Sequence, residues 1–254
     1  MGASSAGDGL EKVGLRAFTA ARVELGTTGV SVRTRDALAF TLAHAQARDA
    51  VYARLDVRGV VAGVEGLGLK AVEVKSAARD RAEYLRRPNL GRRLDEASVQ
   101  ELEAGGAVDG DGLRLTVILG DGLSAVAVER NALGVLAGLL EVLGGWALTE
   151  VVVATQARVA LGDTVGEALK SDATVMLIGE RPGLSAADSL GAYITWRPRV
   201  GATDAERNCV SNIREGGLEA RDAGRRIAYF LGEAKRLGAS GVGLKDPEEL
   251  GLLR

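Results

Sequence analysis

The sequence predicts an α/β fold, in which helices flank a parallel β-sheet. Three short runs of almost continuous apolar residues carry this prediction, at positions 113–119, 150–155 and 173–179. The segments that follow the first two runs, residues 123–143 and 162–170, are expected to be helices. Strands without polar alternation are typical of a parallel sheet buried on both faces. Their alternation with helices makes the predicted fold Rossmann-like.

The N-terminal part of the chain is expected to be mainly helical and to pack against that sheet. Apolar residues fall irregularly over 10–25, which indicates at most a weakly amphipathic helix. Thr34 is a candidate N-cap for the strongest helix of this part, residues 34–55. The apolar stripe of that helix consists of Leu38, Leu42, Ala45, Ala50 and Ala53. A short helix over residues 79–87 ends before Pro88, because proline cannot continue a helix.

The pattern changes at the DGDG sequence of residues 109–112, which predicts a turn and a domain boundary. We therefore expect an N-terminal leader and helical region, residues 1–111, and a Rossmann-like α/β domain, residues 112–254. Within the second region, residues 193–198 are expected to form a fourth strand. A last helix over residues 216–238 ends at a glycine, which suits a helix C-cap.

The composition excludes several classes of protein and site. The single cysteine cannot form a disulfide within the chain, which argues against a disulfide-stapled secreted scaffold. One histidine and one cysteine cannot supply the nitrogen and sulfur ligands of a zinc site. The 32 Lys and Arg residues nearly balance the 34 Asp and Glu residues, so no overall positive field attracts nucleic acid. No segment has the ~20 apolar residues of a membrane span, and we expect a cytoplasmic protein.

Three loops follow the ends of the predicted strands, at residues 120–124, 155–163 and 179–183. The carboxyl ends of parallel strands share one rim of the sheet, where turn backbones and helix N-termini bind ligands. The third loop, GERPG, holds Glu180 and Arg181 in a turn stiffened by proline. Those two charges either serve a site or are simply solvated.

The first loop, GDGLSA, approaches the G-x-G-x-x-A fingerprint of a dinucleotide site. However, the next strand ends in Thr155 and Gln156, where such a site needs an acid for the ribose hydroxyls. Asp121 would also place a carboxylate beside the pyrophosphate. A plain glycine-rich turn and a nucleotide site both remain open at this loop.

One long segment, residues 178–218, closely resembles the small (light) subunit of ethanolamine ammonia-lyase. It reads IGERPGLSAADSLGAYITWRPRVGATDAERNCVSNIREGGL. Four shorter segments resemble the same family, in family order: LRRPNLGRRL (85–94), DGLSAVAV (121–128), ARVALGD (157–163) and SGVGLKD (240–246). The resemblance extends from about Ala21 to Asp246.

The resemblance implies a lyase that converts ethanolamine to acetaldehyde and ammonia by a radical mechanism with adenosylcobalamin. In that family a large TIM-barrel subunit holds the substrate. The small subunit covers the cofactor with a Rossmann-like domain, and several copies of each form one complex. In many bacteria such complexes are associated with a microcompartment. No membrane or nucleic-acid partner is implied.

The family's cobalamin contacts match Val159 in ARVALGD, Glu180 in GERPG and Cys209 in ERNC. A corrin is an apolar disc edged with amides, so it needs apolar contact and a few polar anchors. Val159 can supply the first, and Glu180 can accept from a corrin amide, steadied by Arg181 or by a backbone N–H. Cys209 is small and weakly polar. The further candidates are Asp121, Ser124, Arg207 and Asn208.

The resemblance implies no catalytic side chain and no metal ligand on this chain. The only histidine, His44, lies in LAHAQAR, which does not match the D-x-H-x-x-G motif of enzymes that place a histidine on cobalt. The cofactor is therefore expected to keep its own benzimidazole base. Two alternatives stay open beside the lyase subunit: a stand-alone nucleotide-binding enzyme that uses GDGLSA, and a non-catalytic assembly protein that packs against a barrel.

Overall fold

The computed structural model describes residues 14–15, 22–23, 25–105 and 112–245. The strands are β1 (Thr27–Thr28), β2 (Ser31–Val32), β3 (Ala71–Lys75), β4 (Leu113–Gly120), β5 (Trp146–Leu148), β6 (Val151–Thr155), β7 (Ala173–Gly179), β8 (Leu190–Trp196) and β9 (Arg207–Ile213). The helices are α1 (Thr34–Tyr52), α2 (Val57–Gly66), α3 (Arg81–Arg86), α4 (Glu96–Ala104), α5 (Ala125–Leu140), α6 (Leu161–Ala168) and α7 (Ala220–Leu237), with short 3-10 turns at Leu90–Arg92 and Asp204–Glu206. No helix among these residues is long and apolar enough to cross a membrane.

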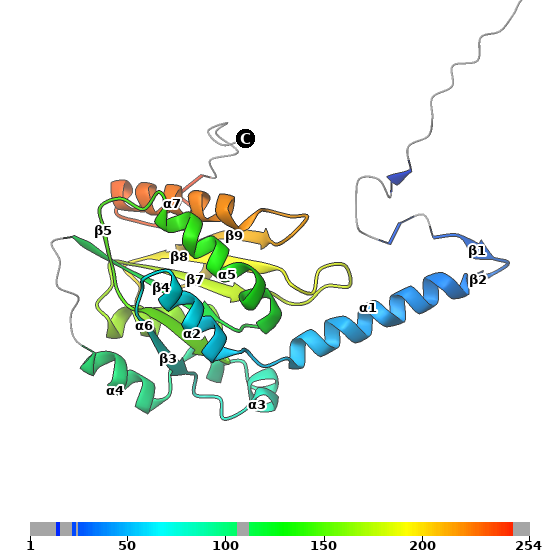
Figure 1. Cartoon of the computed structure of the whole chain (residues 1–254), viewed down its shortest axis with the longest axis horizontal. Helices are drawn as coiled ribbons and strands as arrows, with labels where there is room; N and C mark the ends of the chain where they lie inside the picture. The colour runs from blue at the N-terminus through cyan, green and yellow to red at the C-terminus, as the bar shows by residue number, and fades with distance from the viewer. Residues whose placement is uncertain (1–13, 16–21, 24, 106–111, 246–254) are drawn as a thin grey trace, which may run out of the picture.

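A seven-stranded sheet forms the centre of the molecule, with β3, β6, β4, β7, β8 and β9 in this order and β5 paired to β4 (Figure 1). The strands β3, β6, β4 and β7 are parallel, whereas β8 and β9 are antiparallel to their neighbours. The expected α/β fold with a mainly parallel sheet flanked by helices is therefore confirmed.

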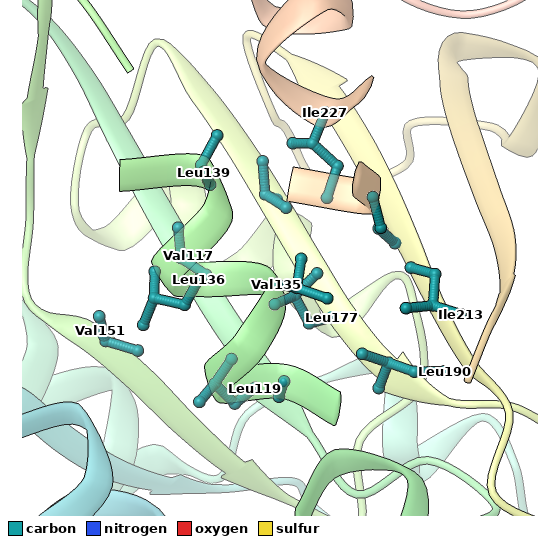
Figure 2. Packing of buried hydrophobic residues seen from close by; sticks show 14 of the residues in the cluster. Val117, Leu119, Val135, Leu136, Leu139, Val151, Leu177, Leu190, Ile213 and Ile227 are labelled. Atoms are coloured by element: carbon teal, nitrogen blue, oxygen red, sulfur yellow. The ribbon is translucent and has the colours of Figure 1, made fainter. Parts of the chain in front are cut away.

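Helices cover both faces of the sheet, as the unbroken apolar strands require. On one face α2, α5 and α7 pack on side chains such as Val117, Leu119 and Leu177, part of the cluster in Figure 2. On the other face α4 and α6 pack on Ile118 and Met176. Successive residues of β4 thus enter opposite cores, which explains why this strand shows no polar alternation.

Five strands were not predicted: the short β1, β2 and β5, and the longer β3 and β9. Strand β3 lies in the N-terminal region and pairs in parallel with β6, so this region contributes a strand to the sheet as well as helices. Strand β9 carries polar residues on its exposed side and lacks the apolar run of a buried strand. The predicted strand at 193–198 is β8, which begins three residues earlier and runs antiparallel to β7. The domain division at residue 112 stays a prediction.

Helix α1 corrects two expectations. Thr34 is its first residue and makes no side-chain cap, because the N-cap position belongs to Arg33. The larger residues of the expected apolar stripe are not buried: Leu38 is 65% and Leu42 60% exposed, whereas Ala50 of the same stripe is buried. Helix α1 projects away from the sheet (Figure 1). The predicted helix over 10–25 and the start of the turn at 109–112 fall largely outside the described residues.

Four other helices begin at an ordinary side-chain cap, and α7 ends at a glycine. Asp56, Asp80, Asp95 and Ser124 each accept a backbone N–H at the start of α2, α3, α4 and α5. Helix α7 ends at Gly238, whose φ of 68° is left-handed, as predicted for that glycine.

Close packing of α5 on α7 depends on glycines, among them Gly224 of α7 and Gly138 of α5. A Cβ at Gly224 of α7 would overlap the backbone nitrogen of Leu139 and come within 2.6 Å of the Val135 carbonyl oxygen. We expect Gly224→Ala to lower the free energy of unfolding by about 1–3 kcal/mol, because the helices must move apart. Gly232→Ala, on the same helix with open space around it, should instead raise stability by up to about 1 kcal/mol. Urea unfolding of both variants measures this, and equal effects would contradict the packing argument.

Candidate functional site

The three residues expected to contact the cofactor come from separate elements, and the sheet brings them to one face. Val159 lies in the loop between β6 and α6, Glu180 directly follows β7, and Cys209 lies within β9. Between them, Tyr193 of β8 is paired in register with Met176 of β7 and with Cys209. Val159 and Tyr193 both pack on the core beneath α6. Directly paired residues share a face of a sheet, so Cys209 lies on the same side as Tyr193.

Among the described residues, no helix covers this face over β8 and β9. Helix α7 packs on their other side, where Val210 is buried, whereas Cys209 and Ser211 are exposed. Antiparallel β8 and β9 are joined without a crossover helix, so no helix is available to cover them. The result is an open surface that extends from α6 to the edge of the sheet.

Glu180 is held in place by Ser189, which precedes β8. The Ser189 hydroxyl donates to Oε2 of Glu180 at 2.6 Å, and the Glu180 N–H donates to the Ser189 carbonyl at 2.9 Å. The other carboxylate oxygen, Oε1, lies over Gly191, where an added Cβ would come within 2.9 Å of it. Arg181 is exposed and does not steady the carboxylate, which corrects the expectation for this pair. Glu180 can therefore offer one oxygen to a ligand.

Cys209 is a neutral thiol at neutral pH. Desolvation by its neighbours raises the pKa of the Cys209 thiol, and Glu180 raises it further, against a hydrogen bond from Tyr193 that lowers it. Burial likewise raises the pKa of Tyr193, and Cys209 adds to this shift. A protonated thiol and a protonated phenol make a weakly polar surface and not a nucleophile or a base.

A cavity of about 880 Å³ adjoins Val159 and Tyr193. Its walls come from the segment around the 3-10 turn Leu90–Arg92, from the loop before α6 and from the loop before β9. The volume lies within the about 300–1,000 Å³ of ordinary small-molecule sites. The side chains at its edge are Pro88, Arg92, Arg93, Leu94, Arg158, Val159, Ala160, Asp163, Thr164, Tyr193, Val200, Gly201, Ala202, Thr203 and Asp204.

A buried ion pair joins the two sides of this region. Arg207 at the start of β9 binds Asp163 of α6 through two parallel contacts, Nη1–Oδ1 at 2.6 Å and Nη2–Oδ2 at 2.7 Å. Both side chains are only 2% exposed. The guanidinium also donates to Thr195 and to the Ala202 carbonyl, both at 3.0 Å. Because Asp163 lies four residues after Val159 and Arg207 two before Cys209, the pair fixes these two candidates relative to each other.

Comparison with known proteins identifies the family of this chain. The family model "Ethanolamine ammonia-lyase light chain (EutC)" matches residues 10–245. The chain is 50% identical over 242 residues to the ethanolamine ammonia-lyase small subunit of Xanthomonas campestris pv. campestris (strain B100), covering 94% of this chain and 89% of that one. It is 51% identical to those of Pseudomonas aeruginosa (strain LESB58), over 93% and 87% of the two chains, and Bradyrhizobium diazoefficiens, over 91% and 89%. The chain belongs to the ethanolamine ammonia-lyase light-chain family.

The four further candidates of this light chain make hydrogen bonds that stabilise the fold. Arg207 is engaged by Asp163, and Asn208 exchanges two hydrogen bonds with the Gly241 backbone at 2.7 and 3.0 Å. Ser124 caps α5 and donates to the Ala187 carbonyl at 2.7 Å. Asp121 accepts from the Ala157 N–H at 3.0 Å. These four side chains are buried, and each makes hydrogen bonds within the fold.

The nucleotide-binding alternative is not favoured in a light chain with this geometry. Helix α3 narrows the crevice between the ends of β4 and β6 to a cavity of about 290 Å³. Arg81 donates to Asp121 and to the Gly122 carbonyl, at 3.2 and 2.8 Å. The Tyr84 hydroxyl lies 2.9 and 2.8 Å from the carbonyls of Gly122 and Ala157. A Cβ at Gly122 would overlap the Gly179 carbonyl oxygen, which explains the glycine in GDGLSA by packing alone.

The sequence did not reveal Tyr193, Ser189 or Arg158 as parts of this region. The sequence predicted only that Tyr193 lies in a strand. That its side chain lies beside Cys209 depends on the antiparallel pairing of β8 with β9. Ser189 lies nine positions after Glu180 in the sequence, so their hydrogen bond depends on the path of the loop between β7 and β8. Arg158 alone had a local signal in the sequence, because it immediately precedes Val159.

The Asp163–Arg207 pair yields a stability prediction. Arg207→Met should lower the free energy of unfolding by about 3–5 kcal/mol, because it leaves the Asp163 carboxylate buried and unpaired. The double variant Asp163→Leu/Arg207→Met should recover much of this loss. Arg236→Met is the control, since the Arg236–Glu233 pair is exposed on α7 and its loss should change little. Equal, small losses for Arg207→Met and Arg236→Met in urea unfolding would refute the prediction.

Proposed function

We propose that this chain is the small subunit of an adenosylcobalamin-dependent ethanolamine ammonia-lyase, and that it contacts the cofactor through Val159, Glu180 and Cys209. The observation that carries the proposal is the open face on which these three residues meet around Tyr193. The identity of about 50% to ethanolamine ammonia-lyase small subunits, over more than nine-tenths of the chain, supports it. The reaction converts ethanolamine to acetaldehyde and ammonia.

The chemistry of the open face suits a corrin. Val159 and the ring of Tyr193 offer apolar contact, and the thiol of Cys209 is uncharged. Oε1 of Glu180 is free to accept a hydrogen bond from an amide at the corrin edge, while Ser189 holds the other oxygen. Hydrogen bonds to a charged acceptor are stronger than neutral ones, so one such anchor can orient a large apolar ligand.

The proposed division of labour leaves the reaction itself to other parts of the complex. When bound, adenosylcobalamin supplies the radical chemistry. The residues of this chain that surround the face hold the cofactor, and Cys209 and Tyr193 stay protonated because their pKa values are raised. We infer that the residues that bind ethanolamine lie on the large subunit.

Exposed apolar side chains on α1 support the need for a partner. Leu38, Phe40 and Leu42 are each about half or more exposed, and Tyr52 is 61% exposed, on a helix that projects from the molecule (Figure 1). Contiguous exposed apolar residues mark interaction surfaces. We infer that α1 contacts the large subunit, and that the complex is cytoplasmic, with microcompartment association as a property expected from the family.

The role of Glu180 is testable by cofactor affinity. Glu180→Gln should weaken binding of cobalamin to the complex with the large subunit by about tenfold, because a charged acceptor is replaced by a neutral amide. Glu65→Gln, an exposed position on α2 at the opposite face, is the matched control. Equilibrium dialysis with cyanocobalamin gives both constants, and equal affinity of the two variants would rule out the proposed anchor.

The function as a whole is tested by reconstitution. We expect the chain to co-purify with its large subunit, and the complex to form acetaldehyde from ethanolamine when adenosylcobalamin is added. Binding of NAD by the chain alone, with no response to cobalamin or to the large subunit, would instead establish a nucleotide enzyme. Full activity of the large subunit alone would establish an assembly protein without a part in catalysis.

A further inference from the structure

Three arginines line the cavity beside Val159 and have no assigned role. Arg92 and Arg93 come from the segment LRRPNLGRRL, and Arg158 directly precedes Val159. The same cavity reaches Val159 and Tyr193, so it is continuous with the face proposed to contact the cofactor. A ligand on that face can therefore extend a side group towards the arginines.

The structure holds Arg158 firmly. Its guanidinium lies over the ring of Tyr84, 4.5 Å from the centroid, and Tyr84 is fully buried. Its backbone N–H donates to the Gly91 carbonyl at 2.7 Å. A Cβ at Gly91 would come within 2.9 Å of the Arg158 side chain and of the Gln156 carbonyl, so only glycine allows the segment with Arg92 and Arg93 to lie this close.

The positive charge of these arginines is not neutralised by the chain. Within the described residues, none of the three lies within 4.0 Å of a carboxylate oxygen, and the buried Nε of Arg158 has no hydrogen-bond partner. The two acidic residues of the cavity both contact a fourth arginine, Arg207. Asp163 is paired with it, and Asp204 lies 3.6 Å from its Nε. Because both carboxylates of the cavity contact Arg207, the three lining arginines leave an excess of positive charge there.

We propose that Arg92, Arg93 and Arg158 form a subsite for a phosphodiester, the one in the nucleotide loop of cobalamin. This inference rests on the proposed function. Cobalamin carries this single phosphate on a flexible arm at the edge of its corrin, and arginine matches the geometry of phosphate oxygens through paired N–H donors. The subsite would select the complete cofactor over corrinoids that lack the nucleotide loop.

The test compares two corrinoids that differ in this group. Cyanocobalamin has the phosphodiester and dicyanocobinamide lacks it. We expect the double variant Arg92→Gln/Arg93→Gln, in complex with the large subunit, to bind cyanocobalamin at least about tenfold more weakly and dicyanocobinamide unchanged. Lysines at both positions should restore part of the affinity for cyanocobalamin, since the charge is kept. Equilibrium dialysis measures all of these without any turnover.

Arg86→Gln is the matched control, because Arg86 lies in the same segment but is exposed and outside the cavity. Equal weakening of both corrinoids by the double variant, or no weakening of either, would overturn the subsite. Inorganic phosphate bound by the wild-type complex together with cyanocobalamin would assign the arginines to a free anion and overturn it too. If the wild-type complex binds neither corrinoid, the proposed function fails, and the subsite with it.

Discussion

The buried pair between Asp163 and Arg207 is the interaction on which the open face depends. It links the first turn of α6 to the first residue of β9, two elements far apart in the sequence and not adjacent in the sheet. A charge pair so completely removed from water needs further hydrogen bonds, and Thr195 and the Ala202 carbonyl accept two from Arg207, whose Nε lies 3.6 Å from Asp204.

The mixed direction of the sheet decides where a large ligand can lie. The parallel strands are covered on both faces by helices, because each crossover connection places a helix on the sheet. The antiparallel strands β8 and β9 have α7 on one side only, and their other side exposes Cys209. The same fold thus provides a rigid, close-packed core and a broad open surface beside it.

The glycine-rich turns and the buried polar residues serve this arrangement in a different way from the side chains of the open face. Asp121, Arg81 and Tyr84 narrow the crevice where a nucleotide would bind in a related topology. On the neighbouring face, Ser189 holds one oxygen of Glu180, and Tyr193 is hydrogen-bonded to Cys209. A chain that only holds a cofactor needs no acid–base residue, and the raised pKa values of Tyr193 and Cys209 agree with that role.

The sequence by itself determined the apolar strands β4, β6 and β7, the helices between them, the end of α7 at Gly238 and the family. These follow from local periodicity and motifs. Only the tertiary structure decided that β3 joins the sheet, that β8 and β9 are antiparallel, that the stripe on α1 stays exposed, and that Arg207 pairs with Asp163. Each of these depends on contacts between residues distant in the chain. Strand direction and burial are set by what packs against a segment, and its own pattern does not contain that information.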